Sequence, residues 1–109
     1  MAAATSVALH QNGNQQFGGV FSNVKTVVAV LDTASIANGA STTDTVAIPN
    51  VLLGDFVLAI SAATSLSGLV RTAHVSAAGV VTIVTINSTG AAVDLPSAVI
   101  KLVVASPTF

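Results

Sequence analysis

Residues 69–87 read LVRTAHVSAAGVVTIVTIN, and this stretch decides between a membrane helix and a pair of strands. It belongs to a longer uncharged segment, residues 72–93, whose 22 positions match the length of a membrane-spanning helix. The segment contains His74, Asn87, two glycines and six Ser or Thr residues, and turn signals such as Ala78-Gly79 separate its short apolar clusters. It therefore predicts two β-strands and no membrane helix.

The same strand-forming composition continues through most of the chain. Val, Ile and Thr make up 36 of the 109 residues, whereas Glu is absent and Lys occurs twice. Residues that favour strands thus dominate those that favour helices. Short β-branched runs bounded by turn residues predict six strands, at residues 24–31, 43–48, 55–62, 69–76, 80–87 and 98–105. The expected fold is all-β, an antiparallel β-sandwich of about six to eight strands.

Residues 1–23 differ from the rest of the chain. They are rich in Ala, Gln, Asn and Gly, and the segment QNGNQQFGG at residues 11–19 is too polar and glycine-rich to pack as a regular element. The sequence therefore predicts a flexible, extended N-terminal arm over residues 1–23, anchored by Phe17 and Phe21, and a β-sandwich domain over residues 24–109. The arm lacks the basic segment and apolar core of a signal peptide, so we expect it in the mature protein.

Side-chain alternation assigns the faces of the predicted strands. In the strands at residues 55–62 and 98–105, six residues are expected to face the core: Phe56, Leu58, Ile60, Ile100, Leu102 and Val104. The outward positions of a solvated sandwich should be polar, yet several strands are apolar there as well. These outward residues include Val27, Ala29, Leu31, Val57, Val99 and Val103. Because no helix is predicted to cover them, we expect a symmetric homo-oligomer to bury the outer faces.

Formal charge is scarce. Seven residues carry the net charge of −1: Lys25, Asp32, Asp44, Asp55, Arg71, Asp94 and Lys101. Ordinary soluble domains are about 25% charged, so this surface is unusually bare for a free monomer. Three scattered basic residues cannot form a nucleic-acid footprint, and they also disfavour binding to anionic membranes. Arg71 and Lys101, in the middle of predicted strands, are either edge or outer-face charges or halves of intersubunit ion pairs with an aspartate.

The sequence offers no set of residues for catalysis or for binding a metal or cofactor. Cysteine is absent, and His10 and His74 lie in different contexts without a further ligand to complete a usual metal set. The four aspartates fall at predicted strand ends or turns, where Asp caps backbone groups. No nucleophile elbow or phosphate-binding glycine loop occurs, and Trp and Tyr, the usual platforms for sugars and bases, are absent. We therefore expect no enzyme, no cofactor and no small-molecule substrate.

Two long runs of the chain resemble small β-sandwich domains of tailed-bacteriophage virions. They are LDTASIANGASTTDTVAIPNVLLGDFVLAI at residues 31–60 and GLVRTAHVSAAGVVTIVTINSTGAAVDLPSAVIKLVV at residues 68–104. Such domains occur as capsid cement or decoration proteins and as modules of head and tail fibres. The resemblance rests on composition and turn pattern. It implies a jelly-roll-like sandwich that assembles as a trimer on the shell, and it transfers no catalytic residue.

A stand-alone chain of this length suits a cement subunit better than a fibre. The sequence thus predicts a capsid cement protein, made in the host cytoplasm, that binds itself and the major capsid protein on the outer surface of the virion. A head-fibre or tail module is the alternative within this class, and a small lectin-like ligand-binding sandwich is the alternative from another class. The residues predicted to contact the oligomer or the capsid are Phe17, Phe21, Val27, Ala29, Arg71, Val99, Lys101 and Val103.

Overall fold

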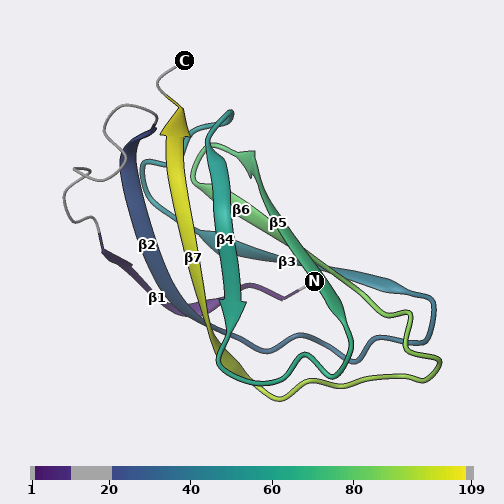
Figure 1. The fold of residues 1–109 in the computed structure, drawn as a ribbon. Coiled ribbons are helices and arrows are strands. Elements are labelled where there is room, and N and C mark those ends of the chain that lie inside the picture. Colours follow the sequence, from purple (N-terminus) through teal and green to yellow (C-terminus); the bar gives the residue numbers. More distant parts are fainter. Residues whose placement is uncertain (1, 11–20, 108–109) are drawn as a thin grey trace.

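The computed structural model describes residues 2–10 and 21–107, which form a sandwich of two antiparallel sheets without a helix among them (Figure 1). The all-β sandwich expected from the sequence is therefore confirmed. The strands are β1 (Thr5–His10), β2 (Phe21–Leu31), β3 (Ser41–Ala47), β4 (Phe56–Ala62), β5 (Val70–Ala77), β6 (Val80–Ile86) and β7 (Ala98–Pro107). Each β-branched run that predicted a strand forms one, and the uncharged segment forms most of the β5–β6 hairpin.

Strands β2 and β7 occupy the centre of the larger sheet, whose strand order is β1-β2-β7-β4. They pair antiparallel, with Val27 opposite Leu102. The smaller sheet has the order β3-β6-β5 and lies behind the larger one in Figure 1. Its β5–β6 hairpin turns at Gly79, whose φ of +76° is a left-handed conformation that glycine adopts without a steric penalty.

The core fills the space between the two sheets with aliphatic side chains. Its buried members are Val27, Ala29, Leu31, Val46, Ile48, Val51, Val75, Val81, Ile83, Ile100, Leu102 and Val104. The three members from β7 are those that alternation predicted. Burying a side chain of this kind contributes roughly 1.5–3 kcal/mol, so the facing strands are held mainly by apolar packing.

The face predicted for β2 was wrong. Val27 and Ala29 are fully buried and Leu31 is 3% exposed, so these residues pack in the core and are not available to another molecule. The outward positions are Val28 and Val30, which are half-buried. Because residues 27–31 are apolar at every position, alternation could not distinguish the inward face from the outward one.

Strand β4 departs from simple alternation at a β-bulge. Leu58 is the extra residue, because its neighbours Val57 and Ala59 pair with consecutive residues of β7. An extra residue reverses the alternation beyond it. Phe56 and Leu58 are therefore 39% and 40% exposed, whereas Val57 and Ile60 pack against the core. The core position predicted for Ile60 was right, and the faces predicted for Phe56, Leu58 and Val57 were wrong.

The N-terminal segment adds a strand that the sequence did not predict. Residues Thr5–His10 form β1 at the edge of β2, while Ala3 forms a parallel bridge with Thr45 of β3. Ser6 has a φ of +52°, and the register of β1 is irregular between Thr5 and Ala8, just after the segment passes from one sheet to the other. Residues 2–10 thus close one side of the sandwich, and this part of the predicted arm is integrated into the sheets.

Three long connections, residues 32–40, 63–69 and 87–97, gather at the lower end of the sandwich in Figure 1. A second buried cluster joins them, with one member from each connection: Ile36, Leu69 and Leu95. The buried side chain of Asn87 donates from Nδ2 to the carbonyl oxygens of Ile36 and Ala91, at 2.8 Å in both cases. These contacts make the connections an anchored unit, which we call the loop lobe.

Two matched substitutions test the assigned faces. Leu102 is fully buried and Leu53 is 71% exposed. Leu102→Ala should lower the free energy of unfolding by about 2–5 kcal/mol because it leaves a cavity, whereas Leu53→Ala should change it by less than about 0.5 kcal/mol. Denaturation in urea measures both values, and equal effects would contradict the fold described above.

Candidate interaction surface

The outward side of the larger sheet carries an apolar surface with one charge. The register of β2, β7 and β4 brings together the residues that we call the Lys101 face: Thr26, Val28, Val30, Ala59, Ser61, Val99, Lys101 and Val103. Lys101 lies between Val28 of β2 and Ser61 of β4, near the middle of this face. Three residues predicted from the sequence as contact residues, Val99, Lys101 and Val103, are thus brought together.

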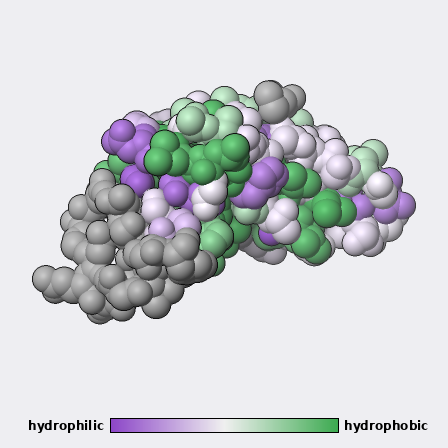
Figure 2. All heavy atoms as spheres, turned by 90° about the horizontal axis from the view of Figure 1, so that it is seen from above, coloured by the Kyte–Doolittle hydropathy of each residue, from purple (hydrophilic) through white to green (hydrophobic). Residues whose placement is uncertain are grey.

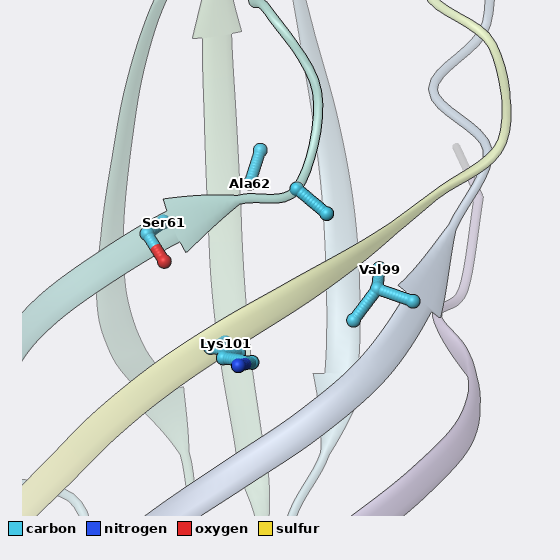
Figure 3. Close-up of a pocket in the computed structure, with 5 residues that line it drawn as sticks. Ser61, Ala62, Val99 and Lys101 are labelled. Carbon is cyan, nitrogen blue, oxygen red and sulfur yellow. The ribbon is translucent and has the colours of Figure 1, made fainter.

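A shallow hollow lies on the Lys101 face (Figure 3). Its volume is about 140 Å³, and it is lined by Ser61, Ala62, Ala63, Val99 and Lys101. Figure 3 shows that its walls come from β7 and from the end of β4. Pockets for drug-sized ligands measure about 300–1,000 Å³. The hollow is too small for such a ligand and has room for a side chain from another protein.

Lys101 is exposed and has no hydrogen bond or ion pair with any residue that the structure describes. Its neighbours on the face are aliphatic or small, so none of them supplies a counter-charge. Any molecule that covers the face must therefore bring an acceptor for the ammonium or leave a buried charge unpaired, which is strongly unfavourable.

Arg71 does not belong to this surface, although the sequence suggested it as a contact residue. It lies on the edge strand β5, but its side chain is directed inward and half-buried. Its Nε donates to Thr85 Oγ1 at 3.2 Å, and its Nη2 donates to Thr33 Oγ1 at 3.1 Å. Both threonines are buried. The guanidinium donates its hydrogen bonds to residues of its own chain, so the position of Arg71 does not fit the interpretation as half of an intersubunit ion pair.

Asp44 forms the acidic end of the same network. Asp44 was predicted at a strand end or turn, but it lies within β3 and is fully buried. Its Oδ2 accepts a hydrogen bond from Thr33 Oγ1 at 3.2 Å, and its Oδ1 accepts one from the backbone N–H of Ala2 at 3.1 Å. Burial lowers the pKa of Arg71, and the nearby Asp44 carboxylate opposes this shift. The network ties the N-terminal segment, β3 and β5 together.

A second apolar area, not predicted from the sequence, lies around the turn before β4. Leu52 and Leu53 are 61% and 71% exposed, and with the exposed Phe56 and Leu58 they form what we call the Leu53 patch. Asp55 has the turn role predicted for it, since its Oδ2 accepts a hydrogen bond from the Leu52 N–H at 3.0 Å. Figure 2 looks down on this end of the sandwich and shows hydrophobic atoms at the surface. The sequence does indicate this patch, because Leu52 and Leu53 lie within the predicted turn that ends at Gly54.

The remaining residues predicted as contact residues are Phe17, Phe21, Val27 and Ala29. Val27 and Ala29 are buried in the core. Phe17 lies outside the described residues, as does the side chain of Phe21, which begins β2.

Within residues 2–10 and 21–107 no three His, Asp or other acidic residues are grouped so that they could hold a metal ion, and His74 is exposed. The described residues include no helix that is long and apolar enough to cross a membrane.

Asp44→Asn tests the buried network. The substitution removes the carboxylate near the half-buried guanidinium of Arg71 and should lower the free energy of unfolding by about 2–3 kcal/mol, less than for a fully buried pair because Arg71 keeps contact with water. The matched control is Asp32→Asn at an exposed position, which should change stability by less than about 0.5 kcal/mol. Urea denaturation would contradict this account if the two variants were equally stable.

Comparison with known proteins adds no relative to this description. No protein-family model matches the chain, and neither the curated proteins nor the solved structures contain a match. What the chain does must therefore be argued from the surfaces described above.

Proposed function

We propose that the chain is a structural protein of a tailed-bacteriophage virion, a cement protein that self-associates and binds the outside of the head at junctions between major capsid subunits. The observation that carries this proposal is the Lys101 face, an apolar sheet surface with a single unpaired charge. Such a surface is suited to burial against protein and poorly suited to permanent contact with water.

The charge balance of the whole surface supports the same proposal. Of the seven formal charges, Lys25 and Asp44 are buried, which leaves five on a surface of 5724 Å², or about one per 1,100 Å². Soluble domains keep roughly a quarter of their residues charged, which helps them to stay apart in solution. A surface with so few charges is typical of a protein that stays in contact with other protein molecules.

Two adjoining apolar areas offer the two contacts that a cement protein needs. The Lys101 face lies on the outer side of the larger sheet, and the Leu53 patch extends from the turn before β4 onto the same side at Phe56 and Leu58. In the proposed arrangement the Lys101 face joins copies of the chain and the Leu53 patch rests on the shell. Binding that favours the expanded shell stabilises it by mass action, without any chemical step.

Binding to emptied, expanded phage heads tests the proposal. Purified protein should pellet with the heads in a saturable manner, with enough copies to cover the shell. Leu53→Ser should weaken this binding by roughly tenfold or more, because burial of one leucine is worth about 1.5–3 kcal/mol. The matched control is Val70→Ser, which alters an exposed apolar residue on the other sheet and should leave binding unchanged.

The outcome separates cement from the alternatives. Heads that retain no protein would contradict the proposal. A few copies confined to one vertex would instead favour a head-fibre or tail module, and equal binding by the two serine variants would exclude the Leu53 patch as the contact with the shell.

A further inference from the structure

We propose that Lys101 of one copy pairs with Asp94 of a second copy, so that the loop lobe of one sandwich docks on the Lys101 face of another. This inference rests on the self-association in the proposed function and identifies the residues that carry it. The partner is thus a second copy of this chain, recognised by one carboxylate within an apolar surface.

The position of Lys101 restricts how two copies can meet. It lies in the central strand β7 between Val28 and Ser61, so a partner that covers the face also covers the ammonium. Two copies packed face to face about an axis through this point would place two ammonium groups together. Like charges in a desolvated interface are strongly unfavourable. The surface that covers Lys101 must therefore be a different part of the partner, and it must carry a carboxylate.

The chain itself supplies such a carboxylate. Asp44 is buried and Asp55 is engaged in its turn, which leaves Asp32 and Asp94 as the other acidic residues, both exposed. Neither has a hydrogen bond or ion pair with a described residue. Two carboxylates are thus free to meet the free ammonium of Lys101.

Asp94 fits the Lys101 face better than Asp32. It lies on the loop lobe beside small or apolar residues that are exposed to solvent, including Ala92 and Pro96. At the corresponding positions beside Asp32, Val30 is half-buried and Ala34 is exposed. The Asp94 carboxylate in an apolar loop is complementary to the Lys101 ammonium in an apolar face. When the two surfaces meet, the apolar side chains around both groups are removed from water and the two charges pair.

The loop that carries Asp94 is also held in place. Val93 exchanges backbone hydrogen bonds with Ile36 at 2.9 and 3.0 Å, and Leu95 is 7% exposed in the second cluster. Asp94 therefore projects from a loop fixed on both sides, so little conformational freedom is lost on docking. The hollow beside Lys101, about 140 Å³ and lined partly by Ala62 and Ala63, has room for a side chain of this size.

A charge exchange tests the pairing. Sedimentation velocity across the micromolar range should show that the unmodified chain associates. Lys101→Asp and Asp94→Lys should each weaken association by at least about tenfold, because each places like charges at the contact. The double variant Lys101→Asp/Asp94→Lys should recover most of the lost affinity, since it restores opposite charges. Asp32→Lys is the matched control and should associate like the unmodified chain.

Each outcome bears on a different claim. A monomeric unmodified chain would overturn the self-association in the proposed function and this pairing with it. An associating chain whose single variants are unaffected, or whose double variant fails to recover, would overturn the pairing alone. The same holds if Asp32→Lys weakens association as much as Asp94→Lys. Thermal unfolding of each variant, monitored by circular dichroism, shows whether any loss of association comes from loss of the fold.

Discussion

The antiparallel pairing of β2 with β7 is the constraint on which the rest of the structure depends. It places Val27 and Leu102 side by side in the core, where both are fully buried. Because successive side chains of a strand point to opposite faces, the same register also places Val28 beside Lys101 on the outer side. The pairing that builds the core thus determines the composition of the surface that we propose as the interface between copies.

Polar groups inside the sandwich serve to hold its parts together. Hydrogen bonds run from Arg71 through Thr33 to Asp44, and they join three parts of the chain: strand β5, the connection that follows β2, and strand β3. The Asp44 carboxylate also accepts a hydrogen bond from the N–H of Ala2. Asn87 does the same for the loop lobe. Buried polar groups are costly unless they are bonded, so these networks favour one arrangement of the connecting segments.

The sequence was sufficient for the fold class and for most strands, because β-branched runs and turn residues are local signals. It was insufficient where the signal was not local. The face of β2 could not be assigned because residues 27–31 are apolar at every position. The bulge at Leu58 depends on pairing with β7. Strand β1 forms because Thr5–His10 pair with the edge of β2, while Ala3 bridges to β3.

The candidate surface was predicted in part. Val99, Lys101 and Val103 follow from alternation within one strand, and the structure places them on one face. The inward direction of Arg71 depends on Thr33 and Asp44, which are distant in sequence, so no local pattern reveals it. For the Leu53 patch, the sequence showed only that two leucines lie in a turn, where polar residues are usual.

Labelling of Lys101 by an amine-reactive reagent, followed by mass spectrometry at increasing protein concentration, tests the central claim most directly. If the Lys101 face joins copies of the chain, Lys101 should react readily in dilute protein and become protected as association proceeds. Lys25, which is 2% exposed, should react slowly throughout and serves as the internal control. Equal labelling of Lys101 at every concentration would show that the face stays open to solvent and would contradict the account.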